Sequence, residues 1–177
     1  MITIGKRAPA PSDLIGHLLA CHDRIRKFVA LAAQAGGAAA GGAEIAEACA
    51  AVERYFERAL PFHIDDEERS IVPRLLGKRA DVDEALRTME AQHHAHEPLI
   101  AKMLVASRAL REAPGSATSR ERLRVAAVRL AAELEPHLEL EERVVFPAVR
   151  SLLGAEEQAQ IRREQAARRS NSWVPVP

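Results

Sequence analysis

Residues 86–110 read LRTMEAQHHAHEPLIAKMLVASRAL, and their apolar side chains recur in alternating steps of three and four residues. This spacing puts them on one side of an α-helix, the pattern of a helix that turns one face toward a bundle core. Two histidines occupy positions on this face without breaking its spacing. The predicted core-facing residues of this helix are Leu86, Met89, His93, His96, Ile100, Met103, Ser107 and Leu110.

Three further segments carry the same pattern, at about residues 12–34, 43–76 and 116–153. Glycines and prolines separate the segments, and short connections between long helices favour antiparallel packing. Each segment again has a histidine on its apolar face. The core-facing residues expected from them are Leu14, Leu18, His22, Ile25, Val29 and Ala32; Phe56, Leu60, His63, Glu67 and Ile71; and Leu130, Leu134, His137, Glu141, Val144 and Ala148.

Composition supports the same class. The chain is rich in the helix formers Ala, Leu, Glu and Arg, aromatic residues make up 3% of it, and no stretch alternates like a strand. We predict an all-α chain with an antiparallel up-down four-helix bundle over residues 12–153, a short extra C-terminal helix over 154–169 and a disordered tail over 170–177. The arginines of the short helix are expected on a solvated face.

Charge and apolar content exclude several classes. The chain has 25 basic and 25 acidic residues, so it lacks the basic surplus of a dedicated nucleic-acid binder. No apolar run approaches the roughly 18 residues that span a bilayer, and none follows Lys6 and Arg7, so neither a membrane span nor a secretory signal is expected. Cys21 and Cys49 lie in helical segments and make no disulfide framework. We expect a cytoplasmic protein, and its oligomeric state stays open.

An internal repeat marks the second and fourth segments. Residues 63–69, HIDDEER, are matched by residues 137–143, HLELEER, and a proline follows each histidine by ten residues, at Pro73 and Pro147. In both copies a histidine and a glutamate stand four residues apart. They therefore share one helix face and point into the same layer of the core.

The paired glutamates predict a metal site. A buried glutamate is costly unless it is paired or bound to a cation, and here Glu67 and Glu141 meet histidines from every helix. The alternatives are a solvated His–Glu pair in each copy, or histidines that only pack in the core. Four apolar faces that each carry a histidine, two of them with a glutamate, favour the metal site. Imidazole with carboxylate suits iron, manganese or zinc.

Several neighbours of these residues are expected to have other roles. The second glutamates of the repeat, Glu68 and Glu142, are expected to be exposed charges. His17 lies five residues before His22, about 140° around the helix, so it is a boundary residue. Prolines within two residues of candidate ligands are expected to bend their helices rather than end them. These prolines are Pro61, Pro98 and Pro136.

Three stretches resemble the hemerythrin-like HHE cation-binding family. They are residues 18–26 (LLACHDRIR), residues 60–68 (LPFHIDDEE), and residues 137–142 (HLELEE) with Phe146 and Pro147. The resemblance covers about residues 12–153 and implies a non-haem di-iron centre with five histidines and two bridging carboxylates. Oxygen-carrying members have an aspartate five residues beyond the fourth-helix histidine. The second repeat copy is instead like the bacterial and iron-repair branches.

The third helix departs from the oxygen carriers, which have two histidines four residues apart there. This chain has His93, His94 and His96. The core-facing spacing selects His93 and His96 and turns His94 toward the flank by about 100°. The metal ligands that the resemblance then implies are His22, His63, His93, His96 and His137, with Glu67 and Glu141 as bridges.

The resemblance implies a protein that binds two iron ions, with zinc or manganese as substitutes, and that binds O2 or NO reversibly in stress sensing or iron handling. We expect a binding protein rather than an enzyme. Two alternatives stay open. A ferritin-like di-iron oxidase or ferroxidase needs Glu-x-x-His on each of two helices, and the chain has one such spacing, Glu90/His93. A metal-free helical interaction module would hold less than one metal ion per chain.

Overall fold

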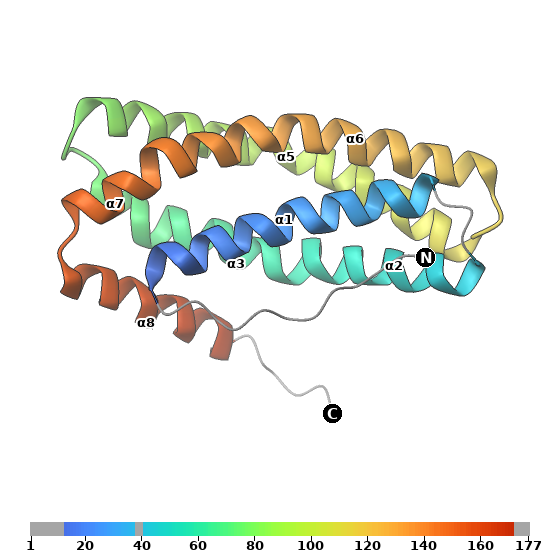
Figure 1. The fold of residues 1–177 in the computed structure, drawn as a ribbon, viewed down its shortest axis with the longest axis horizontal. Helices are drawn as coiled ribbons and strands as arrows, with labels where there is room; N and C mark the ends of the chain where they lie inside the picture. Colours follow the sequence, from blue (N-terminus) through green and yellow to red (C-terminus); the bar gives the residue numbers. More distant parts are fainter. Residues whose placement is uncertain (1–12, 38–40, 172–177) are drawn as a thin grey trace.

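The computed structural model describes residues 13–37 and 41–171, which are helical almost throughout (Figure 1). Four helical rods form a bundle, and a further helix lies alongside it. None of the described residues belongs to a strand. In chain order the elements are α1 (Leu14–Gly37), α2 (Gly42–Arg54), η1 (Tyr55–Ala59), α3 (Leu60–Asp66), η2 (Glu67–Ile71), α4 (Val72–Leu75), α5 (Ala80–Glu112), α6 (Ala117–Leu140), η3 (Glu141–Val145), α7 (Phe146–Leu152) and α8 (Ala155–Asn171).

The four rods are α1, α2 to α4, α5, and α6 to α7, and each runs antiparallel to the next (Figure 1). Contacts join α1 to α2, α2 to α5, α5 to α6 and α6 back to α1, which closes a ring around the interior. This confirms the predicted all-α antiparallel bundle. Within the described ranges, none of the helices combines the length and apolar character that crossing a bilayer requires.

The interior consists of two apolar clusters, core A and core B, with a polar layer between them. The polar layer contains the seven predicted metal ligands. Along every rod the buried residues pass from one core, through the polar layer, to the other. Representative members are Val29, Val52, Leu110 and Leu130 in core A, and Leu14, Leu75, Leu86 and Val149 in core B.

Three π-helical turns, η1, η2 and η3, interrupt the rods. Each ends two residues before a proline, at Pro61, Pro73 and Pro147. The residue just before each proline donates its N–H to the carbonyl five residues earlier. A proline has no N–H and clashes with the carbonyl four residues earlier, so the wider turn accommodates it. The helix continues through Pro98 and Pro136 without such a turn.

The π turns also change which residues face the core. Glu67 is the first residue of η2, and Glu141 is the first residue of η3. A π turn contains one more residue than an α turn, so positions after it rotate relative to a strict helical spacing. The predicted core residue Val144 is therefore only half-buried, and Val145 is fully buried instead.

The predicted C-terminal helix is present as α8, which packs against α1 and α3 (Figure 1). It ends at Asn171, two residues beyond its predicted end, and the rest of the predicted disordered tail lies outside the described residues. The expectation that its arginines are all solvated is wrong. Arg168 and Arg169 donate hydrogen bonds of 2.8 and 2.7 Å to the carboxylate of Asp66, which is fully buried.

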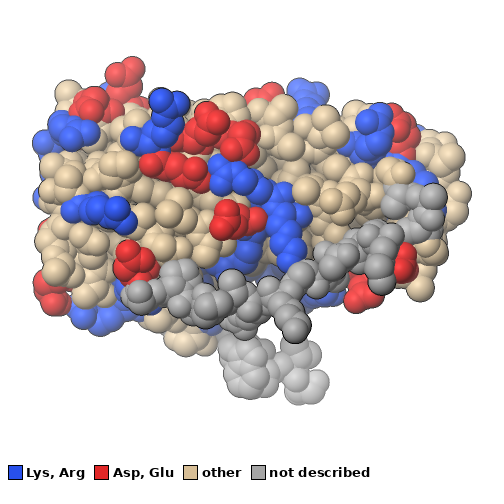
Figure 2. All heavy atoms as spheres, viewed as in Figure 1, with Lys and Arg blue, Asp and Glu red and all other residues tan. Residues whose placement is uncertain are grey.

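Figure 2 shows basic and acidic side chains interspersed over one face of the molecule. The largest group of basic atoms on this face lies near its middle. Many exposed charges are paired locally; for example, Arg124 donates to Glu121 at 2.7 Å. Such exposed pairs contribute little stability. The fold therefore depends mainly on its buried layers.

Candidate metal centre

All seven predicted ligands lie in the polar layer, and all four rods contribute to it. None of the seven exposes more than 5% of its surface. Glu67 and Glu141 each begin a π turn, so the two copies of the repeat present their carboxylates from equivalent positions. By element, the residues are His22 on α1, His63 on α3, Glu67 on η2, His93 and His96 on α5, His137 on α6 and Glu141 on η3.

Each buried glutamate lies between two histidines from different rods. The closest N···O distances are 2.8 Å from Glu141 Oε2 to His22 Nε2, 3.0 Å from Glu141 Oε1 to His137 Nε2, 3.4 Å from Glu67 Oε1 to His63 Nε2 and 3.5 Å from Glu67 Oε2 to His93 Nε2. The two oxygens of one carboxylate thus face two different imidazoles. This is the arrangement that a carboxylate bridging two cations requires.

The potential ligand atoms form two overlapping groups, and within each group all atoms lie within 4.8 Å of one another. Both groups include Glu141. One group takes histidines from α1 and α3, and the other takes them from α5 and α6. The groups are His22, His63, Glu67 and Glu141, and His93, His137 and Glu141.

Unpaired polar atoms show that these residues fit cations. Ten buried side-chain nitrogen or oxygen atoms of the described residues have no hydrogen-bond partner, and eight of them belong to the polar layer. Buried polar atoms are normally paired, and imidazole nitrogen with carboxylate oxygen is a common donor set for transition metals. The eight atoms are Nε2 of His22, both ring nitrogens of His63, both oxygens of Glu67, Nε2 of His93 and both oxygens of Glu141.

The other histidines near the layer differ in their contacts. His96 is buried, with its ring 5.0 Å from that of His137, but its Nε2–H donates to the backbone carbonyl of Glu133 at 3.2 Å. Its role as a ligand, like those of the other six residues, stays a prediction. The side chain of His94 is 77% exposed, which agrees with its predicted place on the flank. His17 is half-buried, and its Nε2 lies 4.0 Å from Cys21 Sγ rather than among the ligand atoms.

A family model for the hemerythrin HHE cation binding domain matches residues 13–149. The chain belongs to this family. The match includes all seven predicted ligands and ends before α8. A comparison with curated proteins found no match. Membership in the HHE family and the buried His–Glu cluster together support a metal cofactor.

Residues outside the predicted set contact the predicted ligands of this HHE domain and orient their rings. Glu142 Oε1 lies 2.8 Å from His22 Nδ1, and Glu68 Oε1 lies 2.8 Å from His93 Nδ1. An imidazole that donates from Nδ1 keeps its Nε2 lone pair for a metal. The expectation that the second glutamates of the repeat are simply exposed charges is wrong. Their side chains are only 27% and 31% exposed.

The predicted ligand His137, on the fourth rod, has a comparable partner in Gln92, whose Oε1 lies 3.0 Å from His137 Nδ1. Glu142 is also held in place, because Arg26 donates to its Oε1 at 2.8 Å. Both glutamates follow a motif histidine of their own rod by five residues, a repeat that marks the two positions but not their partners on other rods. Gln92 had no such signal.

The remaining motif histidine, His63, has no acceptor at Nδ1 among the residues that the structure describes. Its Nε2 faces Glu67, and its ring meets that of His22 edge-on at 5.2 Å. Burial, reinforced by the neighbouring imidazoles, lowers the pKa of His63 to about 3. The imidazole is therefore neutral at physiological pH, as a metal ligand must be.

In the metal-free protein, the pKa values of the two buried carboxylates, Glu67 and Glu141, shift in opposite directions. Burial and the adjacent charge of Glu141 raise the pKa of Glu67 well above its usual value. Burial also opposes ionisation of Glu141, but its contacts with His137 and His22 outweigh burial and lower its pKa. Two carboxylates that share one site cannot both ionise easily without a cation. A metal pair would remove this conflict.

A void of about 10 Å³ adjoins the centre. Histidines and aliphatic side chains line it together. Because the rest of the wall is apolar, the void suits a small, weakly polar ligand better than an ionic one. It is lined by His63, His93, His96, His137, Ile25, Leu60, Ile64, Ile100 and Leu134.

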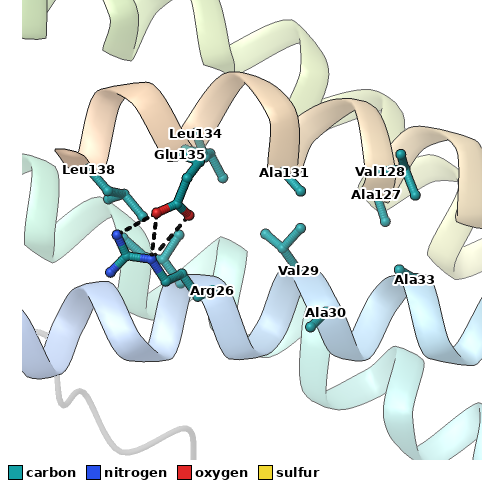
Figure 3. Close-up of a pocket in the computed structure, with 11 residues that line it drawn as sticks. Arg26, Val29, Ala30, Ala33, Ala127, Val128, Ala131, Leu134, Glu135 and Leu138 are labelled. Atoms are coloured by element: carbon teal, nitrogen blue, oxygen red, sulfur yellow. Dashed lines mark hydrogen bonds and ion pairs between the residues drawn. The ribbon is translucent and has the colours of Figure 1, made fainter. Parts of the chain in front are cut away.

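A surface groove of about 220 Å³ runs between α1 and α6 (Figure 3). Small apolar side chains such as Val29 and Ala131 line it, and at one end Arg26 binds both carboxylate oxygens of Glu135 at 2.8 to 3.1 Å. Ile25 and Leu134 line both the groove and the void. These two side chains therefore separate the centre of this HHE domain from the groove.

Proposed function

We propose that this HHE protein binds a pair of iron ions and, at that centre, reversibly binds O2 or NO, in stress sensing or iron handling. The observation that carries the proposal is the position of each buried carboxylate between two histidines of different rods. A single-ion site would not need two such carboxylates. The donor set of imidazole and carboxylate is one that iron uses in proteins.

Within this proposal, the ligands divide between two ions. His22 and His63 would hold one ion, and His93 and His137 the other. Glu67 and Glu141 would bridge them, and the nearby His96 completes the five histidines that the family resemblance implies. When bound, such a pair supplies redox-active iron with a coordination position for a diatomic ligand.

The surroundings of the centre favour a gas over a polar substrate. The void beside the histidines is small and its other walls are aliphatic. A diatomic molecule needs little space and few hydrogen bonds, whereas a polar substrate needs convergent donors and acceptors. Ile25 and Leu134 exclude bulk water from this side, because only 2% and 5% of their surfaces are exposed. The chain's own residues thus provide a dry, narrow site.

The test is metal analysis with optical spectroscopy on protein purified without chelator. We expect about two iron ions per chain, and near-ultraviolet absorption of a ferric pair that bleaches on reduction. Addition of O2 or NO to the reduced protein should give a new spectrum that reverses when the gas is removed. A colourless zinc protein, or less than one metal per chain, would overturn the proposal. Irreversible consumption of O2 would indicate an oxidase instead.

A further inference from the structure

Two aliphatic side chains stand between the void beside the metal centre and the surface groove between α1 and α6. Ile25 and Leu134 line both spaces, and they expose only 2% and 5% of their surfaces. We call these two side chains the gate. His63 also joins the void to a pocket, but a predicted ligand must stay in place and three arginines line that pocket. An aliphatic side chain, by contrast, changes rotamer without breaking a hydrogen bond.

The groove outside the gate suits a small, weakly polar molecule. Between the two rods its wall consists of short side chains such as Val29, Ala30 and Ala131, which leave a space of about 220 Å³ (Figure 3). These side chains offer no hydrogen bond to a solute. An ion or a polar metabolite would lose hydration there without compensation, whereas O2 or NO loses little. The groove therefore favours the same class of molecule as the void does.

An ion pair joins α1 to α6 directly outside the gate. Arg26 follows Ile25 on α1, and Glu135 follows Leu134 on α6. The Arg26 guanidinium donates to both oxygens of Glu135 at 2.8 to 3.1 Å, at one end of the groove (Figure 3). We call this ion pair the latch. A bidentate contact of this kind fixes the relative position of its two groups, so the latch holds the two rods together beside the gate.

The latch is able to open. Arg26 and Glu135 are 32% and 49% exposed, and exposed ion pairs contribute little stability and are screened by salt. Arg26 is also held by Glu142, to which it donates at 2.8 Å. Among the described residues, Arg26 is the only hydrogen-bond partner of the Glu135 side chain. Opening of the latch therefore frees Glu135 and leaves Arg26 in place on Glu142.

We propose that O2 or NO reaches the void from the groove between α1 and α6 by displacing the gate, and that the latch sets how often the gate opens. The inference rests on the proposed function, because it concerns the access of the gas to the proposed centre. Gating of this kind changes how fast a ligand arrives and leaves. It leaves the affinity unchanged, since entry and exit cross the same barrier. Equal changes in both rates therefore distinguish the path from a change in the centre itself.

The first test measures the rates of NO binding to the reduced, iron-loaded protein by stopped flow. Substitutions in the gate would disturb buried packing and the void, so the variants are placed outside it. Ala131→Phe fills the groove from an exposed position and should slow association and dissociation by the same several-fold factor. The matched control Ala132→Phe adds the same ring at the next exposed position, which does not line the groove, and should keep the wild-type rates.

Glu135→Gln tests the latch. Both rates should rise about two- to fivefold, the range that an exposed ion pair can contribute. Because the gas is uncharged, salt should speed its binding to the wild type only by weakening the latch, and Glu135→Gln should abolish this dependence. The control Glu121→Gln removes the exposed pair that Glu121 forms with Arg124 within α6. It should keep the wild-type rates and their salt dependence.

The second test needs neither iron nor gas binding at the centre. Dissolved O2 is paramagnetic and enhances the relaxation of the methyl protons that it approaches, which NMR measures on the full chain kept free of iron. The methyls of Ile25 and Leu134 should show more enhancement than those of Leu14 and Leu153, which are comparably buried in core B. Ala131→Phe should reduce the enhancement at the gate and leave that in core B unchanged.

The two proposals fail separately. Enhanced relaxation at the gate in a chain that binds no iron or no NO would overturn the proposed function alone. Reversible NO binding at rates that Ala131→Phe leaves unchanged, or gate methyls enhanced no more than those of core B, would overturn the path alone. Altered affinity in Ala131→Phe would also overturn the path, because the centre itself would have changed. Rates that respond to Ala131→Phe but neither to Glu135→Gln nor to salt would overturn the latch.

Discussion

The two copies of the repeat, residues 63–69 and 137–143, enter the same layer but meet different surroundings. In each copy a π turn begins at the glutamate four residues after the histidine, Glu67 or Glu141, and the next glutamate accepts from a histidine on another rod. Glu141 belongs to both ligand groups and contacts its histidines at 2.8 and 3.0 Å, whereas Glu67 belongs to one group, with distances of 3.4 and 3.5 Å. The second copy is therefore the more tightly joined half of the centre.

The third position after each histidine explains part of this difference. It is Asp66 in the first copy and Leu140 in the second. Asp66 is buried and binds Arg168 and Arg169 of α8, while Leu140 packs against core B. The first copy therefore contacts the C-terminal helix α8 through ion pairs, whereas the second packs within the four-rod bundle. The repeated motif thus sets which side chains enter the polar layer, and the elements packed against each copy set the charges around them.

Removing the shared carboxylate is expected to have the largest effect. Because Glu141 lies in both ligand groups, Glu141→Ala should lose both metal ions, while Glu67→Ala should retain about one per chain. Metal content per chain measures this directly. Glu139→Ala changes an exposed glutamate of the same repeat copy and should keep full metal content. Full occupancy in both site variants would rule out the bridging roles.

Substitutions in α5 test the rod that faces both copies. His93 Nε2 lies 3.5 Å from Glu67 and 3.8 Å from Glu141, so His93→Ala should lose the most metal and thermal stability. His96→Ala should lose an intermediate amount, and His94→Ala little, since His94 is exposed. Thermal melts with and without chelator measure the order. If His94→Ala were the most damaging, the orientation of α5 would have to change by one residue.

The outer glutamates should have smaller effects that still separate the copies. Residues that orient a ligand histidine typically contribute about 10- to 100-fold in metal affinity. We expect the loss of metal affinity to be about 100-fold for Glu142→Ala and about 10-fold for Glu68→Ala. Glu142 should have the larger effect because Arg26 also donates to it and so fixes its position. Competition with a chromophoric chelator gives both affinities. Equal losses of metal affinity in the two variants would show that the Arg26 contact does not strengthen the role of Glu142. Unchanged affinity in both variants would show that neither glutamate orients a ligand histidine.

A pH dependence of the metal-free protein is the smallest expected effect. The pKa of His63 is lowered to about 3 in the folded protein, against about 6.5 in an unfolded chain. The unfolded chain therefore takes up a proton first. The stability that neutral His63 contributes is complete above about pH 6.5 and is lost as the pH falls toward 3. Glu67 acts in reverse: its raised pKa contributes stability that is present below about pH 4.3 and is lost as the pH rises through the folded pKa.

Urea unfolding in the presence of chelator checks these signs. Between pH 7.5 and 5, His63→Gln should lose less stability than the wild type, because its side chain cannot titrate. Glu67→Gln should remove the loss that occurs on raising the pH. His94→Gln changes an exposed histidine and should follow the wild type. A wild-type pH profile retained in His63→Gln would contradict the assignment.

The spacing of residues along each helix was enough to predict the fold and the residues of the polar layer. Helical periodicity places His22, His63 and His93 on core-facing positions whatever the neighbouring rods do, and the structure buries each of them. Spacing failed at Val144, because a strict helical period does not include the extra residue of a π turn. The prolines at fixed offsets were the available signal for that turn.

Contacts between rods could not be read from one sequence. Glu68 and Glu142 look like solvated charges until the rotation of α5 and α1 brings an imidazole to each. Asp66 is likewise buried, and its charge is compensated only because α8 brings Arg168 to it. Such partners depend on how rods pack, which local patterns do not specify.

Core A and core B lie on opposite sides of the polar layer, and every rod passes through that layer. Apolar burial therefore stabilises each half-bundle separately, while the plane between them contains most of the unpaired buried atoms. If the proposed cations bind in that plane, we expect them to couple the two halves so that these open as one unit. With the cations withdrawn, we expect core A and core B to open more independently, so that backbone amides on the two sides of the layer exchange with solvent at different rates.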